Sequence, residues 1–171
     1  MSIQDAIKGH DESELFSVRT SWEGEETPRF AYVSREVATF LWEPDVSEKR
    51  LAKRSSSLID DFVEGGYITI GWEPHGKGAK CIMARVDSPD PDYCVWDVRC
   101  LDPKPGVRIL GGFAGKDVFL GLTWDYRENF DDAWTQQIEH CIDEWKRLFG
   151  KCLPLKASNA DEYLSQPFKV V

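Results

Sequence analysis

The sequence lacks the long apolar run that a membrane-spanning helix needs, because no stretch of about 18 apolar residues occurs in it. The segment Met1–Glu14 is polar and acidic and has no apolar core like that of a secretory signal. We therefore expect a cytoplasmic protein that does not contact a membrane, with residues 1–14 frayed.

The spacing of a disulfide framework or a zinc site is also missing. The number of cysteines, five, is odd, and none belongs to a C-x-x-C pair. The three histidines lie far apart in the sequence. We expect free, buried or half-buried thiols in a reducing compartment, with no metal and no cofactor. The cysteines are Cys81, Cys94, Cys100, Cys141 and Cys152, and the histidines are His10, His75 and His140.

Signatures of several enzyme classes are absent. The sequence contains no G-x-x-x-x-G-K-[ST], no G-x-S-x-G and no H-E-x-x-H. The segment Gly76–Lys80 superficially resembles a phosphate-binding loop, but no helix follows it to direct backbone N–H groups at a phosphate. A flexible hairpin loop is therefore favoured there over an anion site.

Positive charge is scarce. Lysine and arginine number 21 against 30 acidic residues, which gives a net charge of −9. A nucleic-acid binder needs clustered cations to neutralise phosphates, so this balance disfavours RNA as a partner. It suits instead a protein partner with a basic surface.

Aromatic residues are plentiful, at 12% of the chain with seven tryptophans. A chain of 171 residues can bury a sizeable core without disulfides, and large aromatic side chains contribute most to that burial. We expect one domain over residues 1–171 with an aromatic-rich core.

Hydrophobic periodicity predicts two helices. One spans about residues 48–64, with Ser47 as its N-cap and Gly65-Gly66 as its end. The other spans about residues 132–149 and carries an apolar stripe at a period of 3.6 residues. A short turn is expected to begin at Asn159.

Alternating or apolar runs predict strands, but the segment Phe30–Pro44 fits either a strand pair or a helix. The predicted strands are 16–22 and 29–33 in a first hairpin, followed by 67–72, 81–86, 93–101, 107–113 and 117–124. Short connections favour an antiparallel meander. The expected fold class is α+β, with a twisted antiparallel sheet of about five or more strands. The long C-terminal amphipathic helix packs on this sheet, and the shorter helix lies near residues 48–64.

Three arginines occur on or just after neighbouring predicted strands. Asp97 and Arg99 share one face of their strand, Arg108 lies at the start of the next, and Arg127 follows the last. Converging guanidinium groups recognise a phosphodiester and stabilise charge that develops during its cleavage. The alternative is that each arginine pairs with its nearby aspartate on an ordinary charged surface. Those aspartates are Asp97, Asp102 and Asp125.

Three tryptophans, Trp22, Trp42 and Trp72, are each followed by glutamate at expected strand ends or turns. Half-exposed tryptophan is typical of binding hot spots, which makes these three residues candidate binding residues. Asp97 is a further candidate binding residue, because together with Arg99 it can line a polar groove. The alternative is that the tryptophans cap the end of the core.

The segments Val95–Arg99, Gly106–Leu110 and Lys116–Leu122 together resemble the three-strand core of the RelE/ParE toxin superfamily. The resemblance covers about residues 95–122. It implies a small ribonuclease, or a gyrase-poisoning relative, whose basic sheet face handles RNA and is covered by an antitoxin segment. Arg99 and Arg108 match the strand arginines of the family. The sequence departs from the ribonuclease branch, which has a lysine pair where Trp124–Arg127 has one basic residue.

Two functions follow as hypotheses. The first is a toxin-type ribonuclease, or a descendant of that fold, that acts on RNA phosphodiesters through Arg99, Arg108 and Arg127. The second is a non-catalytic acidic module that binds a basic protein partner, such as an inhibitor encoded by a phage or mobile element. A small-molecule binding domain stays open as a third reading, since a helix on an aromatic-rich sheet can enclose a pocket.

Overall fold

The structure is a computed structural model, and it describes residues 2–10, 12–19, 27–72 and 80–171. Its strands are β1 (Leu15–Ser17), β2 (Phe30–Ser34), β3 (Ile68–Gly71), β4 (Met83–Arg85), β5 (Trp96–Cys100), β6 (Val107–Gly115), β7 (Val118–Tyr126) and β8 (Phe168–Val170). Its helices are α1 (Ile3–His10), α2 (Arg35–Trp42), α3 (Lys49–Val63) and α4 (Phe130–Phe149). Two short 3-10 turns, η1 (Arg127–Asn129) and η2 (Ala160–Glu162), complete the elements.

The strands form one mixed sheet in the order β1-β2-β7-β6-β5-β4-β3-β8. The strands from β4 to β7 form the predicted antiparallel meander. The flanks differ from the prediction, since β2 runs parallel to β7, and β3 runs parallel to both β4 and β8. The α+β class is confirmed, and the antiparallel description holds for the meander only.

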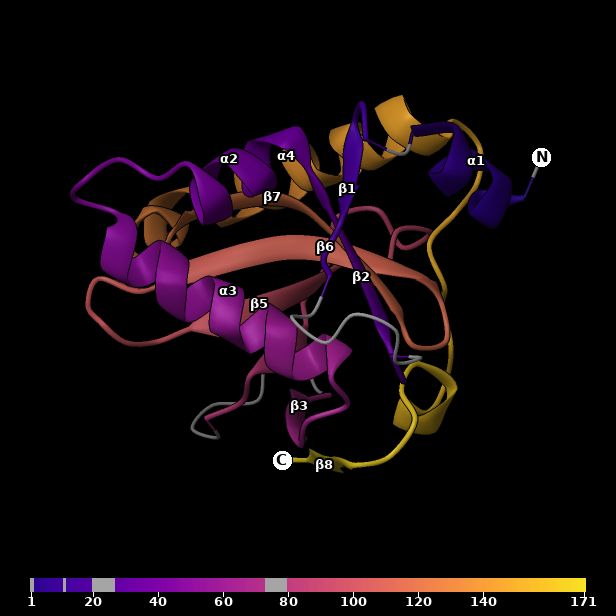
Figure 1. Cartoon of the computed structure of the whole chain (residues 1–171). Coiled ribbons are helices and arrows are strands. Elements are labelled where there is room, and N and C mark those ends of the chain that lie inside the picture. Colours follow the sequence, from indigo (N-terminus) through magenta and orange to yellow (C-terminus); the bar gives the residue numbers. More distant parts are fainter. Residues whose placement is uncertain (1, 11, 20–26, 73–79) are drawn as a thin grey trace.

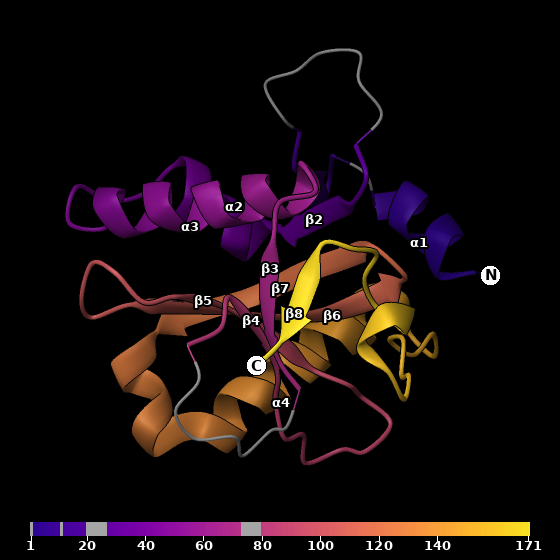
Figure 2. The ribbon, with the colours of Figure 1, turned by 90° about the horizontal axis from the view of Figure 1, so that it is seen from below.

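Helices lie on both faces of the sheet (Figures 1 and 2). Helices α2 and α3 cover one face, and α4 covers the other. Each layer has its own core. The core under α3 includes Trp96, Phe113 and Tyr163, whose rings stack edge-on or tilted, and the core under α4 includes Trp145. The aromatic-rich core that the composition predicts is therefore split by the sheet.

Both predicted helices are present, with different starts. Helix α3 begins after Glu48, whose side chain makes no capping bond to the helix, so Ser47 is not the N-cap. It ends as predicted, because Gly65 has a φ of +78°, a conformation that favours glycine. Helix α4 buries its stripe from Ile138 to Phe149, and its first turn is interrupted at Ala133, where φ and ψ are not helical.

The segment 30–44, ambiguous in sequence, is a strand followed by a helix. Ser34 is the hinge, because its Oγ accepts from the N–H of Val37 and donates to the carbonyl of Leu122, at 3.2 and 2.6 Å. The N-terminal segment forms α1, whose Ala6 and Ile7 are buried, rather than the frayed segment expected from its charge. Among the described residues, no helix has the length and apolarity to cross a bilayer.

A β-bulge changes which face the end of β7 presents. Leu110 pairs with Thr123 but Gly111 pairs with Gly121, so one residue of β7 is unmatched. Beyond this shift, Trp124 turns toward α2 and stacks on Phe40, with ring centroids 3.8 Å apart. Asp125, opposite Arg108, then faces α4.

Arg29 is buried, with 1% of its surface exposed, and connects three separate segments. Its guanidinium donates to the carbonyls of Phe62, Gly66, Ser165 and Pro167 at 2.8 to 3.3 Å. Burial lowers the pKa of Arg29, and Asp117 at 3.8 Å opposes that effect. The start of β2, the end of α3 and the segment before β8 are thereby joined by one side chain.

Candidate functional site

The candidate site is built around a fully buried carboxylate, Asp97 in the middle of the meander. Nε of Arg99 donates to both oxygens of Asp97, at 2.9 and 3.1 Å. The guanidinium of Arg108 donates to Oδ2 of the same carboxylate. An unpaired carboxylate would be costly to bury, and these two arginines supply the partners that a buried carboxylate needs.

Strand geometry brings the three groups together. Asp97 and Arg99 are two residues apart on β5 and therefore share a face, the face under α4. Arg99 and Arg108 are direct partners across β5 and β6. Like charges directly opposite each other repel. The shared aspartate offsets that repulsion and leaves the cluster with a net charge of about +1.

Arg108 is enclosed by the start of α4. Its guanidinium lies 5.9 Å from the ring centroid of Phe130 and 5.4 Å from that of Trp134, and 15% of its side chain is exposed. Its Nε is buried and has no hydrogen-bond partner among the described residues. Arg108 therefore supports Asp97 from beneath a helix and does not lie on an open sheet face.

Arg99 has a different environment, because it reaches a pocket. Its NH1 donates to Sγ of Cys81 at 3.3 Å, and 22% of its side chain is exposed. Burial raises the pKa of the Cys81 thiol, and the neighbouring Arg99 partly offsets this. The thiol is therefore neutral at physiological pH and accepts a hydrogen bond without cancelling the positive charge of Arg99.

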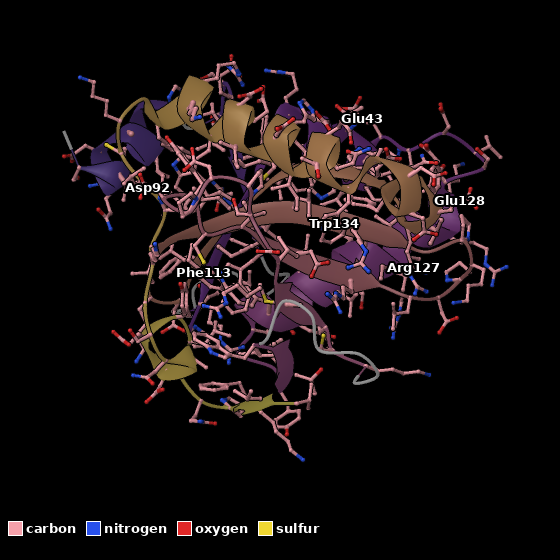
Figure 3. The ribbon with its side chains drawn as sticks, turned by 180° about the vertical axis from the view of Figure 1, so that it is seen from behind. Glu43, Asp92, Phe113, Arg127, Glu128 and Trp134 are labelled. Atoms are coloured by element: carbon pink, nitrogen blue, oxygen red, sulfur yellow. The ribbon has the colours of Figure 1, made fainter. Side chains whose placement is uncertain are left out.

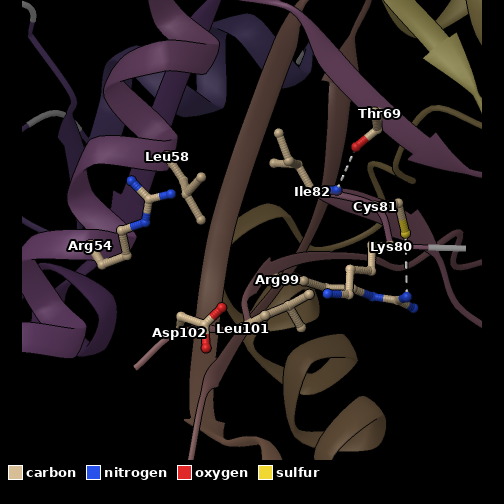
Figure 4. A pocket seen from close by; sticks show the side chains of 9 residues that line it. All are labelled: Arg54, Leu58, Thr69, Lys80, Cys81, Ile82, Arg99, Leu101 and Asp102. Carbon is tan, nitrogen blue, oxygen red and sulfur yellow. Dashed lines mark hydrogen bonds between the residues drawn. The ribbon is translucent and has the colours of Figure 1, made fainter. Parts of the chain in front are cut away.

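We call this cavity the Arg99 pocket (Figure 4). It has a volume of about 280 Å³ and lies between α3, β3 and the last residues of β5. Its lining carries three cations and one carboxylate. The polar lining residues are Arg54, Thr69, Lys80, Cys81, Arg99 and Asp102. Such a pocket attracts a small anion, and a guanidinium held by a buried carboxylate is already oriented to bind it.

Arg127 does not join the other two arginines. It is exposed at the start of η1, and its backbone N–H donates to the carbonyl of Gly106 at 3.0 Å. Figure 3 shows Trp134 against the sheet and Arg127 farther out at the end of the strands. The hydrogen bonds to the carboxylate of Asp125 come from other residues, among them the side-chain amides of Asn129 and Gln137 at 2.6 Å.

The three candidate tryptophans are separated. Trp72 is half-buried, lies against Trp96, and has the guanidinium of Arg85 4.4 Å from a ring centroid, so it caps the core. Trp42 is 47% exposed at the end of α2. Trp22 lies outside the described residues, as does Gly76–Lys80 apart from Lys80.

Sequence reasoning missed the other pocket cations. The basic first half of α3 suggests a solvated surface, and Arg54 from that half is indeed exposed, but it also lines the pocket. Lys80 and Thr69 come from separate segments whose placement depends on the fold. Across the described ranges, no three His, Cys, Asp or Glu side chains lie close enough together to hold a metal ion. Comparison of the chain with protein-family models, curated proteins and solved structures finds no match.

Proposed function

We propose that the protein acts on RNA phosphodiesters, as a toxin-type ribonuclease or a descendant of that fold, and that Arg99 contacts the phosphate. The observation that carries the proposal is the position of Arg99. It is fixed by a fully buried carboxylate and lines a pocket whose charged groups are three cations and one carboxylate. A fixed guanidinium in a partly dry site binds phosphate more strongly than a mobile surface arginine.

Each neighbouring group has a role in this proposal. Arg54 and Lys80 add positive charge around the phosphate, as neutralisation of RNA requires. Asp97 and Arg108 are positioning residues that act through Arg99. Asp102 is the carboxylate of the pocket and our candidate to accept the proton of an attacking 2′-hydroxyl group.

The resemblance seen in the sequence supports the proposal, and the overall charge does not rule it out. The resemblance to the RelE/ParE superfamily falls on β5, β6 and β7, and the two arginines that match that family are the two that bind Asp97. The net charge of −9 opposes RNA binding over the whole surface. The lining of the Arg99 pocket is instead net positive, so RNA can be contacted at this pocket even though the protein as a whole is acidic.

The test is induced expression in a bacterial host, with growth followed and RNA ends mapped. The variants are wild type, Arg99→Gln and Arg19→Gln. Arg19 is an exposed arginine of a surface ion pair outside the pocket, so the control removes the same charge. We expect growth arrest and new RNA ends with wild type and Arg19→Gln, and neither with Arg99→Gln. Normal growth with intact RNA for wild type would refute the nuclease proposal.

A second candidate function is binding of a basic protein partner without catalysis. One observation favours it: Trp42, at the end of α2, is exposed, and the exposed acidic residues Glu43 and Asp45 follow it. Exposed tryptophan beside carboxylates fits a partner that presents lysine and arginine around an apolar pocket. An antitoxin-like or other basic protein captured by wild type and lost with Trp42→Ala, in a complex that weakens with salt, would favour this function.

A further inference from the structure

A second pocket adjoins the Arg99 pocket, and we name it the Tyr126 pocket. Arg50 and Arg54 are one turn apart on α3, and each lines one of the two pockets. The chain itself passes from one to the other, since Asp102 lines the first and Pro103 the second. One helical turn is about 5.4 Å along the axis, so Arg50 and Arg54 are close enough to contact neighbouring groups of one strand.

The two pockets differ in size and chemistry. The Tyr126 pocket is larger, at about 410 Å³, which falls in the range of small-molecule sites, roughly 300 to 1,000 Å³. The apolar half of its lining comes from Leu51, Pro103, Pro105 and the ring of Tyr126, and the other half is polar, with Ser47 among it. Its cations, Arg50 and Lys104, face one carboxylate, Glu128. Its ring and prolines are suited to the face of a flat group and its charged side chains to polar atoms at the edge of that group. The Arg99 pocket, by contrast, has no aromatic residue among the described residues that line it and is suited to an anion.

The ring of Tyr126 is held in place from two sides. Its hydroxyl donates to Oε1 of Glu48 at 3.1 Å. Its ring meets that of Trp124 edge-on, with centroids 5.6 Å apart. Trp124 in turn stacks on Phe40 in the core. An aromatic ring fixed in this way loses little conformational entropy when a second ring stacks on it.

We propose that the Tyr126 pocket binds a nucleobase of the strand whose neighbouring phosphate occupies the Arg99 pocket. This inference rests on the proposed function, because it requires a phosphate at Arg99. Tyr126 and the two prolines contact the faces of the base, and Arg50 and Lys104 contact the flanking backbone. Recognition of single-stranded RNA through unstacked bases on aromatic side chains follows this chemistry.

The test compares two labelled trinucleotides of equal charge by fluorescence anisotropy at low salt. One is a 2′-O-methyl RNA, which cannot be cleaved through its 2′-hydroxyl groups, and the other has the same backbone without bases. Stacking on an aromatic residue is expected to make wild type prefer the base-bearing strand by about ten-fold or more. This comparison needs no variant and so does not depend on the folding of a mutant.

Variants assign the preference to the pocket. Tyr126→Leu is expected to reduce the difference between the two strands to about two-fold or less, while Tyr126→Phe keeps the ring and the preference. The matched control is Tyr67→Leu, because Tyr67 is exposed and lines neither pocket.

The possible failures are distinguishable. Equal affinity of wild type for both strands, with binding lost in Arg99→Gln, would overturn the base pocket and leave the phosphate site standing. A preference that survives Tyr126→Leu would place the base elsewhere and overturn the inference. Absence of binding by wild type to either strand would refute the phosphate site and the base pocket together.

Discussion

At the scale of single residues, the candidate site depends on the carboxylate of Asp97. It has no contact with solvent, and two guanidinium groups are its partners. Removing one partner from a buried ion pair is far more damaging than replacing the whole pair, because a charge is left without compensation. Here one carboxylate compensates two cations, so its loss leaves both unpaired.

Asp97→Asn is therefore expected to lower the free energy of unfolding by about 3 kcal/mol or more. The amide keeps the volume of the side chain but carries no charge to balance Arg99 and Arg108. Urea denaturation measures the effect. The control is Asp92→Asn, an exposed aspartate, which is expected to change stability by less than about 0.5 kcal/mol. Equal stability of the two variants would show that the pairs contribute little.

A second residue-scale prediction concerns alkaline pH. Burial raises the pKa of the Cys141 thiol to about 12, from an ordinary value of 9.0. Below pH 9 the thiol is neutral in both the folded and the unfolded chain, and the fold has its full stability. Between pH 9 and 12 the thiol ionises in the unfolded chain but not in the folded one, so stability falls as pH rises.

Stability measured by urea denaturation from pH 8 to 11 is expected to fall as pH rises, by about 1.4 kcal/mol per pH unit from this thiol alone above pH 9. Cys141→Ala is expected to remove that share of the slope. The lost packing of the sulfur lowers stability equally at every pH, so the slope and the offset separate the two effects. An unchanged slope in the variant would contradict the prediction.

At the scale of elements, the pairing of β6 with β7 depends on a close backbone approach at Gly111. A Cβ atom there would lie 1.8 Å from the carbonyl oxygen of Leu120, a backbone atom that cannot turn aside. The approach occurs at the register shift that turns Asp125 toward α4. Glycine is thus required by the bulge that shapes one side of the candidate site.

Gly111→Ala is expected to destabilise the protein by about 3 kcal/mol or more, because the strands must separate locally. Gly9→Ala is the matched control. Gly9 lies inside α1, and an added Cβ would meet nothing within 4 Å. It is expected to leave stability unchanged or raise it by up to about 1 kcal/mol, since alanine favours the helix. Thermal unfolding of both variants is the measurement, and similar losses in both would contradict the role of the bulge.

Helices and strands could be predicted from the sequence where the pattern that specifies them lies within a short window. The apolar stripe of α4 and the glycine that ends α3 are encoded in short windows, and so is the shared face of Asp97 and Arg99. The parallel pairing of β2 with β7 was not, because the partner of β2 lies more than 80 residues away and no local pattern selects it. The same is true of the Arg99 pocket, whose Arg54, Lys80 and Arg99 meet only through tertiary packing.

Local rules also failed at the bulge. Strict alternation along β7 would put Trp124 on the same face as Leu122, whereas the register shift turns it to the opposite face. The sequence analysis placed Arg127 after the last predicted strand, 117–124, as the third of three arginines that could converge. The strand is two residues longer than predicted and ends at Tyr126, and Arg127 begins a separate turn away from Arg99 and Arg108.

At the scale of the whole molecule, charge is distributed unevenly. The chain carries a net charge of −9, yet the two adjoining pockets are lined by five cations and two carboxylates. Long-range repulsion therefore acts on an approaching polyanion, and attraction acts only close to these pockets. This balance is sensitive to ionic strength, since salt screens both interactions.

Binding of a single-stranded oligonucleotide is expected to weaken with salt, with a slope of log K against log salt of about −2 if the three cations of the Arg99 pocket release counterions. Arg99→Gln is expected to reduce the magnitude of the slope by about 0.7. Anisotropy titrations between 50 and 200 mM salt, roughly the range over which such effects are measured, provide the slope. Affinity independent of salt would contradict a phosphate contact.

The buried guanidinium of Arg29 has a consequence for the timing of folding. Two of its carbonyl partners belong to Ser165 and Pro167, which lie 136 and 138 positions later in the chain. At roughly 5 to 20 residues per second, a ribosome adds them about 7 to 27 s after Arg29. During that interval the nascent chain holds a cation whose native enclosure is not yet complete. The carbonyls of Phe62 and Gly66 are available to Arg29 early, so its enclosure begins at the junction of β2 with α3 and is completed only when the segment before β8 arrives.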